Sequence, residues 1–254
     1  MEMIRLENIS FSYNGKKVLR GISHDFLQGS FTAVMGPNGS GKTTLIRLIN
    51  GILKPLGGEI NIEGKNLARI KTGILAQQMA YVPQMQANIF PATVFDTVLL
   101  GRKPYIRWVP SPDDKEITSK LLVRLGLDDI AMKDINRLSS GQRQRVFITR
   151  ALAQEPRVLL LDEPTANLDL QHQHDVMGLL NELRESGITI VVAIHDLNLA
   201  LKYCSHFMLL DHGRQVAQGA EEIITKELVE NIYRVRVKII KENGSTFIVP
   251  LEPL

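Results

Sequence analysis

The stretch Gly36-Pro37-Asn38-Gly39-Ser40-Gly41-Lys42-Thr43-Thr44 decides the fold of this chain. It fits the pattern G-x-x-x-x-G-K-[ST] without a gap, with an apolar run at residues 31–35 before it and an amphipathic run at residues 45–49 after it. Glycines let a backbone turn tightly and point its N–H groups inward, and the helix that follows directs its positive end at the same point. A strand, a loop and a helix in this order predict a phosphate-binding loop.

Two residues at the end of this loop carry specific chemistry. Lys42 is expected to reach the β- and γ-phosphates of a nucleotide, and the Thr43 hydroxyl is expected to bind Mg²⁺. The alternative is a glycine-rich turn without function, and the flanking strand and helix patterns argue against it.

Composition limits the class of protein. The 254 residues suit one large α/β domain, alone or with a subdomain, and a net charge of +3 is too small to indicate a nucleic-acid partner. The single cysteine, Cys204, excludes an intrachain disulfide and is expected to be a small buried residue. No apolar segment resembles a signal peptide or is long enough to cross a membrane. We therefore expect a chain that is soluble by itself and meets a membrane only through a partner.

Strand and helix patterns predict an α/β fold with a mostly parallel sheet. Short strands are expected in residues 3–35, with a turn at Asn14-Gly15, and a mostly helical insert is expected at residues 87–155. A plausible hairpin surrounds Asn243-Gly244 near the C-terminus. Strand–helix alternation argues for crossover helices; the alternating segments are strands at 158–161, 188–194 and 207–210 and helices at 171–185 and 197–203.

A buried strand ends in two carboxylates, Asp162 and Glu163. At the carboxyl end of a strand beside a phosphate loop, Asp162 can hold Mg²⁺ through water. Glu163 can orient, or take a proton from, a water that attacks the γ-phosphorus. A solvated acidic turn would be the better interpretation only without the phosphate loop.

A second helix start lies at Leu138-Ser139-Ser140-Gly141-Gln142. Ser139 or Ser140 can cap the helix that follows, which leaves free N–H groups at its start. Such a helix end can place positive potential near a γ-phosphate, on the side away from Lys42.

Taken together, these segments make the chain resemble the ATP-binding subunits of ATP-binding-cassette (ABC) transporters over nearly its whole length. Seven segments match family motifs in family order. Five of them are the phosphate loop (residues 36–44, Walker A), the signature motif (138–142), Walker B (158–163), the D-loop (166–169, with Asp169) and the adenine-stacking aromatic Tyr13. The other two are Gln84, which senses Mg²⁺ and the attacking water, and the switch histidine, His195.

The resemblance implies a fold and a set of site residues. The fold is a phosphate-loop, RecA-like ATPase core with an N-terminal antiparallel β part, forming one domain with its core at about 1–86 and 156–254 and a helical subdomain at about 87–155. The expected catalytic residues are Glu163, His195, Gln84 and Lys42, and the expected Mg²⁺ ligands are Thr43, Gln84 and Asp162. ATP is expected to contact Tyr13, Gly36, Pro37, Asn38, Gly39, Ser40, Gly41, Lys42, Thr43, Thr44, Ser139, Ser140, Gly141, Gln142 and Asp169.

The resemblance also implies partners. ATP is expected to join two copies of the chain head to tail, with each nucleotide between the phosphate loop of one copy and the signature motif of the other. The helical part, with residues 86–108 as the candidate surface, is expected to contact an integral membrane permease at the cytoplasmic face of the cell membrane. A substrate-binding protein would take part indirectly, and no nucleic acid is expected.

Two details of the sequence qualify the match. The family usually has glycine where Ser140 stands, and a serine there would cost roughly 1 kcal/mol if its φ were positive. His172 and His174 resemble a metal pair, but residues two apart on a helix do not share a face, so a metal site is rejected.

The cargo is inferred from resemblance alone. Residues 93–105 and the short tail resemble ATPases of ferric-siderophore, haem and cobalamin importers. Manganese or zinc import is the closest alternative, and cobalt or biotin uptake is a further one. A soluble ABC ATPase that acts on ribosomes or protein assemblies is a different class, which often carries two cassettes or a long coiled coil.

Overall fold

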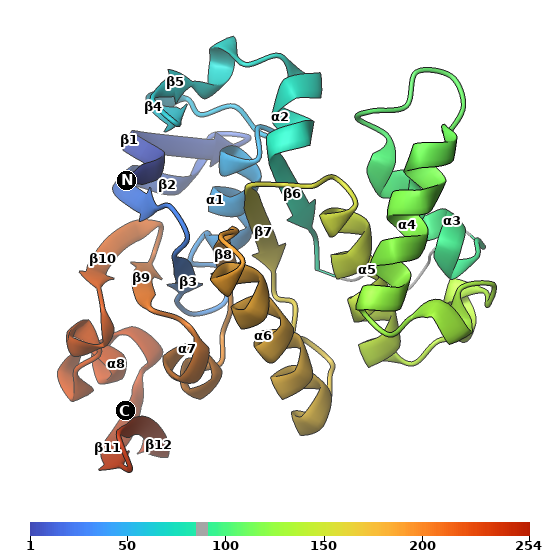
Figure 1. The fold of residues 1–254 in the computed structure, drawn as a ribbon. Coiled ribbons are helices and arrows are strands. Elements are labelled where there is room, and N and C mark those ends of the chain that lie inside the picture. The colour runs from blue at the N-terminus through green and yellow to red at the C-terminus, as the bar shows by residue number, and fades with distance from the viewer. Residues whose placement is uncertain (85–90) are drawn as a thin grey trace. The chain divides into compact units, whose positions relative to one another are not determined.

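The computed structural model describes residues 1–84 and 91–254, which form two compact units. The first unit contains residues 1–69 and 177–254, and the second contains residues 70–176. Figure 1 shows their helices and strands. The division into a core at about 1–86 and 156–254 and a helical subdomain at about 87–155 stays a prediction.

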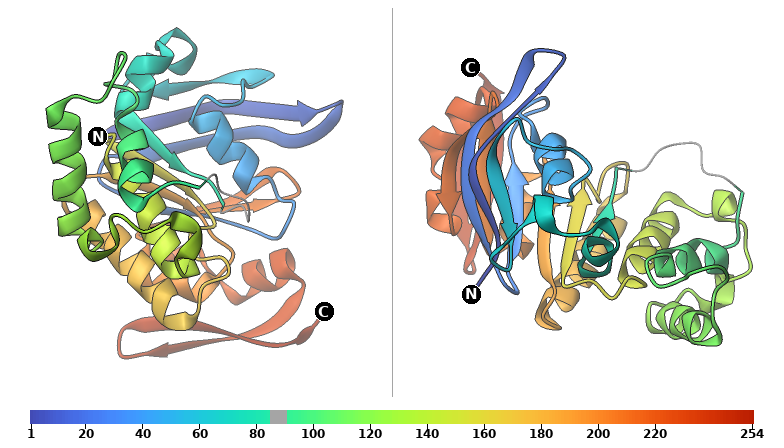
Figure 2. Two further views of the ribbon diagram at one scale, coloured as in Figure 1. Left: turned by 90° about the vertical axis from the view of Figure 1, so that its right-hand side faces the viewer. Right: turned by 90° about the horizontal axis from the view of Figure 1, so that it is seen from above.

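An antiparallel sheet in the order β2-β1-β4-β5 opens the first unit. Its main feature is a hairpin of two long strands, which lie side by side in Figure 2. Asn14 and Gly15 form the turn with φ of 47° and 81°, as a tight two-residue hairpin requires. The expectation of short strands was wrong, because bulges interrupt the alternation of side chains without ending the strands. The strands are β1 (Glu2–Tyr13), β2 (Lys16–Leu27), β4 (Gly57–Ile62) and β5 (Lys65–Asn66).

A second group of strands in the first unit lies in the order β10-β9-β3-β8. Strand β3 pairs in parallel with both β8 and β9, and all five residues of β3 and of β8 are buried. Such continuous apolar strands are typical of parallel sheets covered on both faces. The predicted strands were confirmed, while β10 was missed. The elements are β3 (Phe31–Met35), α1 (Lys42–Ile49), β8 (Thr189–Ala193), α7 (Leu197–Tyr203), β9 (His206–Asp211) and β10 (Arg214–Gly219).

The first unit ends in a helix and a hairpin. Asn243 and Gly244 form the predicted turn, with positive φ at both residues. A helix that ends at Tyr233 and buries Ile232 precedes this hairpin. These elements are α8 (Lys226–Tyr233), β11 (Val235–Glu242) and β12 (Ser245–Pro253).

The second unit combines a two-stranded parallel pair with helices. Strand β6 pairs with β7 from Met79↔Val158 to Val82↔Leu161, so the two strands end together. Ser111 and Asp114 form the capping box that starts α4. The boundary with the first unit falls within α6. The elements are α2 (Thr72–Gln78), β6 (Met79–Val82), α3 (Val94–Leu99), α4 (Pro112–Arg124), α5 (Ser140–Leu152), β7 (Val158–Asp162) and α6 (Leu170–Glu185).

A buried arginine anchors the loop between α3 and α4. Arg102 is 5% exposed, and its guanidinium pairs with Asp114 at 3.0 Å and Glu155 at 2.7 Å. It also donates to the Ala153 carbonyl at 2.8 Å and lies 4.1 Å from the centre of the Tyr105 ring. Burial acts to lower the pKa of Arg102, but its two carboxylate partners outweigh burial and raise it. The loop at residues 103–111 is thereby fixed at its first end.

Candidate functional site

The phosphate loop adopts the tight turn that its glycines predict. It runs between the end of β3 and the start of α1, with φ of 143° at Gly36, 80° at Gly39 and 106° at Gly41. A Cβ on Gly36 would lie 2.1 Å from the Leu210 carbonyl oxygen, and one on Gly41 would lie 2.6 Å from Leu19. Positive φ favours glycine at all three positions, and at Gly36 the backbone of Leu210 also leaves no room for a side chain.

Lys42 is held across the loop. Its side chain is buried, and Nζ donates to the carbonyl oxygens of Gly36 at 2.8 Å and Pro37 at 3.1 Å. A negatively charged acceptor, such as a phosphate oxygen, would compete with these two carbonyls for the Lys42 ammonium group. Ser40 Oγ is buried and has no hydrogen-bond partner in the described parts of the chain, an arrangement that calls for a further ligand or water. Pro37, Asn38, Gly39 and Thr43 are at least partly exposed, and Thr44 is buried in α1.

Asp162 and Glu163 stand at the end of the fully buried strand β7. Asp162 is 2% exposed, and Tyr81 donates its hydroxyl to Oδ2 of this carboxylate at 3.4 Å. Glu163 comes next with a left-handed backbone, φ 49°. That conformation costs a non-glycine residue about 1–2 kcal/mol, and such strain is concentrated at functional sites.

Gln84 meets Glu163 at the adjoining ends of β6 and β7. Gln84 Nε2 donates to Glu163 Oε2 at 2.9 Å, although the two residues lie 79 positions apart. The parallel pairing of β6 with β7 is what brings them together. Both belong to the sequence-predicted catalytic set, and the carboxylate is held in one orientation by a neutral donor.

The signature segment forms the start of α5. Ser139 is the N-cap: its Oγ accepts from the Gln142 amide at 3.2 Å, and Gln142 Oε1 accepts from the Ser139 amide at 3.2 Å. Ser140 is the first helical residue and does not have positive φ. A positive φ at Ser140 would have cost backbone strain. Because its φ is not positive, serine fits this position without that strain.

Asp169 lies just before α6, and its Oδ1 accepts from the backbone amide of His172 at 2.9 Å and from His172 Nδ1 at 2.7 Å. These bonds, the backbone one first, lower the pKa of the exposed Asp169 carboxyl. Asn167 has a left-handed backbone, φ 61°, which asparagine tolerates better than most residues.

Tyr13 and His195 lie in the first unit, at the ends of strands. Tyr13 closes β1, the residue is 42% exposed, and its ring packs edge-on against the ring of Phe11 with 83° between their planes. His195 is exposed between β8 and α7. The next residue, Asp196, caps α7 by accepting from the amides of Asn198 and Leu199.

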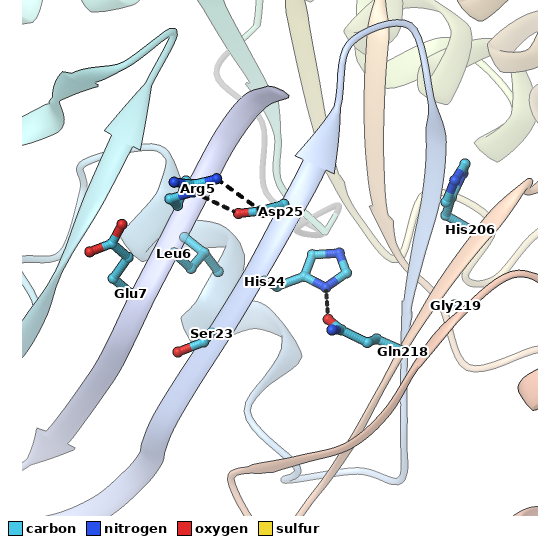
Figure 3. A pocket seen from close by; sticks show the side chains of 9 residues that line it. All are labelled: Arg5, Leu6, Glu7, Ser23, His24, Asp25, His206, Gln218 and Gly219. Atoms are coloured by element: carbon cyan, nitrogen blue, oxygen red, sulfur yellow. Dashed lines mark hydrogen bonds and ion pairs between the residues drawn. The ribbon is translucent and has the colours of Figure 1, made fainter. Parts of the chain in front are cut away.

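A pocket of about 560 Å³ contains none of the residues selected from the sequence. Strands β1, β2, β9 and β10 line it, and Figure 3 shows His24 pointing at Gln218 and Arg5 pointing at Asp25. His24 Nδ1 lies 2.5 Å from Gln218 Oε1, so this ring nitrogen carries the proton. Burial, opposed by the bond to Gln218, lowers the pKa of His24. No sequence pattern distinguishes these residues, because they come from four separate strands.

Cys204 is buried, as expected, and burial raises the pKa of its thiol. In residues 1–84 and 91–254, no helix has the length and apolar character needed to span a membrane.

A family model for the ABC transporter matches residues 19–166, which is more than half of the chain. This chain belongs to the ABC transporter family. The match includes the phosphate loop, the signature segment and the Asp162-Glu163 pair. The chain is therefore an ABC ATPase, an enzyme that binds and hydrolyses ATP.

Curated relatives cover almost all of this ABC ATPase. An ABC transporter ATP-binding protein of Methanocaldococcus jannaschii is 41% identical over 250 residues, which is 98% of each chain. The ferric enterobactin transport ATP-binding protein FepC of Escherichia coli K12 is 38% identical over 256 residues, which is 98% of this chain and 94% of FepC.

Solved structures agree with the family assignment. A metal-chelate type ABC transporter in an inward-facing conformation aligns with a TM-score of 0.87 at 30% identity, covering 99% of this chain and 98% of that chain. A dimeric ATP-binding cassette with bound ADP and Pi, in a post-hydrolysis state, aligns with a TM-score of 0.75 at 30% identity and covers 86% and 98%. The predicted fold, an α/β ATPase core with a mostly parallel sheet and an antiparallel N-terminal part, is thereby confirmed.

Proposed function

We propose that this ABC ATPase powers an importer of an iron chelate, with Glu163 activating the water that attacks ATP. The observation that carries the catalytic part is the 2.9 Å hydrogen bond from Gln84 to Glu163. The bond occupies one oxygen of the carboxylate and orients the group. The other carboxylate oxygen stays available to accept a proton from water, as a general base must.

The phosphate groups of ATP are proposed to bind at the loop of residues 36–44. The loop supplies backbone N–H groups and the N-terminus of α1, and Lys42 would leave its two carbonyl acceptors for phosphate oxygens. The exposed ring of Tyr13 is proposed to stack on adenine, and His195 to contact the γ-phosphate. The buried and unpartnered hydroxyl of Ser40 is consistent with a loop that is completed by a ligand.

Mg²⁺ is the metal that the proposed residues fit. Thr43, Gln84 and Asp162 offer hydroxyl, amide and carboxylate oxygens, which are the ligands that this ion takes in proteins. In the described parts of the chain, no three His, Cys, Asp or Glu side chains are grouped so that they could hold a metal. Nucleotide phosphates would therefore complete the coordination, as is usual for Mg²⁺. When bound, the ion neutralises charge that develops on the phosphates.

A second copy of the chain is proposed to complete each ATP site. The signature segment presents the N-terminus of α5, where backbone N–H groups and the helix dipole favour an anion. The related cassette bound to ADP and Pi is dimeric. In this proposal Ser139, Ser140, Gly141, Gln142 and Asp169 of one copy face the nucleotide held by the phosphate loop of the other.

The proposed cargo is an iron chelate such as a ferric siderophore or haem, with cobalamin as a related possibility. Support comes from the names of relatives over nearly the full chain, which include ferric enterobactin, siderophore and petrobactin transport proteins. We place the chain at the cytoplasmic face of the cell membrane, on an integral membrane permease that a substrate-binding protein supplies. Residues 91–108 are the described part of the proposed permease surface, and residues 85–90 lie outside the described residues.

The test begins with capture of the membrane partner and ends with transport. A tagged Glu163→Gln chain with MgATP is used to capture proteins from native membranes, and the wild-type complex is then reconstituted in vesicles. ATP-dependent uptake is compared for a ferric siderophore, haem, cobalamin, manganese and zinc, with Lys42→Ala as the inactive control.

Uptake of an iron chelate supports the proposal. Uptake of manganese or zinc alone would show that the proposed cargo is wrong and that the proposed transport role is right. Capture of ribosomes or cytosolic assemblies without a membrane protein would refute the transport role.

A further inference from the structure

His172 packs directly against the signature segment of its own chain. A Cβ built on Gly141 would lie 2.2 Å from Cδ2 and 2.7 Å from Cγ of the His172 ring, closer than any real Cβ contact. Gly141 does not have positive φ, so its backbone would accept alanine. Within the chain, the ring of His172 is therefore what a side chain at position 141 would strike, and the backbone conformation is no obstacle.

The same ring is tied to the D-loop. Its Nδ1 lies 2.7 Å from Asp169 Oδ1, and the His172 backbone amide donates to the same oxygen at 2.9 Å. The side chains of His172 and Asp169 keep 37% and 66% of their exposure, so these bonds are partly solvated and contribute little to stability. Their consequence is geometric: the backbone bond places Asp169 beside the first turn of α6, and the ring bond together with the contact at Gly141 restricts the orientation of the ring.

We propose that His172 is a positioning residue that holds the D-loop (residues 166–169) and the signature segment (residues 138–142) in one fixed arrangement. The inference rests on the proposed function, in which both segments face the nucleotide bound to a second copy of the chain. The ring acts as a spacer: Asp169 holds one edge, and the start of α5 rests on another.

The position of α5 matters because its N–H groups act only at hydrogen-bond distance from a phosphate. Preorganised donors of this kind lose effect when they are displaced by about 1 Å, and such a shift can cost about a hundredfold in rate. His172 touches neither the nucleotide bound by its own chain nor the catalytic carboxylate in this scheme. Its loss should therefore affect the step in which two chains combine.

The ring could instead serve only the first turn of α6, where Asp169 caps the helix and His172 follows three residues later. Under that interpretation the contact with Gly141 would be incidental, and substitution would lower thermal stability alone. His174 offers a matched control, because it is a histidine of the same helix two positions on and therefore on a different face.

The first experiment compares His172→Ala, His172→Asn and His174→Ala in the full chain. We expect His172→Ala to weaken ATP-driven dimerisation of a Glu163→Gln chain, and to lower the kcat of the otherwise wild-type chain, by about tenfold to a hundredfold. Affinity of the single chain for ATP should stay within about twofold, because the phosphate loop is unchanged. Asparagine places an amide nitrogen where the ring has Nδ1, so His172→Asn should recover most of the activity. His174→Ala should behave as wild type.

The second experiment tests the steric contact by thermal unfolding. Gly141→Ala should lower Tm, and adding His172→Ala should restore most of the loss, because the ring that the new Cβ would strike is gone. A loss in the double variant equal to the sum of the losses in Gly141→Ala and His172→Ala would show that the two residues are not coupled and would overturn the inference. Three other results would also overturn the inference. They are a wild-type kcat for His172→Ala, a His172→Asn chain as impaired as His172→Ala, and a His172→Ala chain that loses Tm and ATP affinity in parallel.

The two experiments separate this inference from the proposed function. If the Glu163→Gln chain binds ATP and does not dimerise, the proposed two-copy site fails and the positioning role fails with it. In that case the comparison of Tm among the Gly141→Ala, His172→Ala and double variants still reports whether the two residues are in contact. If the chain dimerises and only the His172 variants behave as wild type, the proposed function stands and the inference alone is wrong.

Discussion

Replacing Glu163 with glutamine should remove the general base and keep the site intact. Glutamine has the same shape, and its Oε1 can still accept the hydrogen bond that Gln84 Nε2 donates at 2.9 Å. The left-handed backbone at residue 163 is unaffected by the change of side chain. We therefore expect the fold and the affinity for ATP to be preserved.

The expected magnitude follows from what the carboxylate supplies. A positioned general base contributes about 10²- to 10⁴-fold to a rate, which at 1.36 kcal/mol per tenfold is about 3–5 kcal/mol of activation free energy. The lost hydrogen-bond strength is much smaller, about 1 kcal/mol, because the pair is partly exposed and glutamine still accepts. Nearly all of the effect should therefore appear in kcat.

The assay combines phosphate release with calorimetric titration of ATP and size measurement by light scattering. The variant should lose at least about a hundredfold in kcat, bind MgATP like wild type, and accumulate as a dimer. Glu182→Gln, on the exposed face of α6, is the matched control and should keep wild-type turnover. A Glu163→Gln chain with kcat within about threefold of wild type would refute Glu163 as the base.

Four further predictions concern other parts of the chain. Lys42→Ala should weaken ATP binding about tenfold to a hundredfold, because it removes a charged donor to phosphate, and titration calorimetry measures this. Ser140→Gly should leave the steady-state ATPase rate equal or higher, since serine is unstrained there, and a large loss would contradict this. Arg102→Ala should destabilise the chain by about 3 kcal/mol in urea unfolding, because it leaves Asp114 buried without its charged partner. The lowered pKa of His24 means that the unfolded chain takes up that proton first, so stability should fall as pH drops below about 6.5, and His24→Gln should reduce this dependence in unfolding measured at several pH values.

The sequence predicted most elements because their signals are local. Helix α1 ends before Gly51 and α7 coincides with the predicted residues, and both carry a helical apolar pattern with clear stops. Strand β10 was missed because its short, mostly polar sequence gives only a weak alternation. Helix α8 was missed although its apolar residues follow a helical period after the Thr225 N-cap, so in that case a local signal was present and overlooked. Residues 86–90 of the predicted permease surface lie outside the described residues.

In the candidate site too, local signals were predicted and long-range contacts were not. The phosphate loop and the Asp162-Glu163 pair were identified from the sequence because each is a contiguous stretch with fixed chemistry. The role of His172 could not be seen, and the sequence offered only a rejected metal pair with His174. Its significance comes from a ring 31 positions away in sequence from the glycine that it touches.

The sequence by itself determined the family chemistry of this protein: a loop that binds phosphate, a strand that delivers carboxylates, and a helix start suited to an anion. These properties reside in neighbouring residues, whose spacing sets backbone conformation directly. Tertiary structure alone decided that Gln84 orients Glu163 and that His172 separates Gly141 from Asp169. The physical reason is that strand pairing and ring packing bring together residues whose separation along the chain carries no trace of their contact.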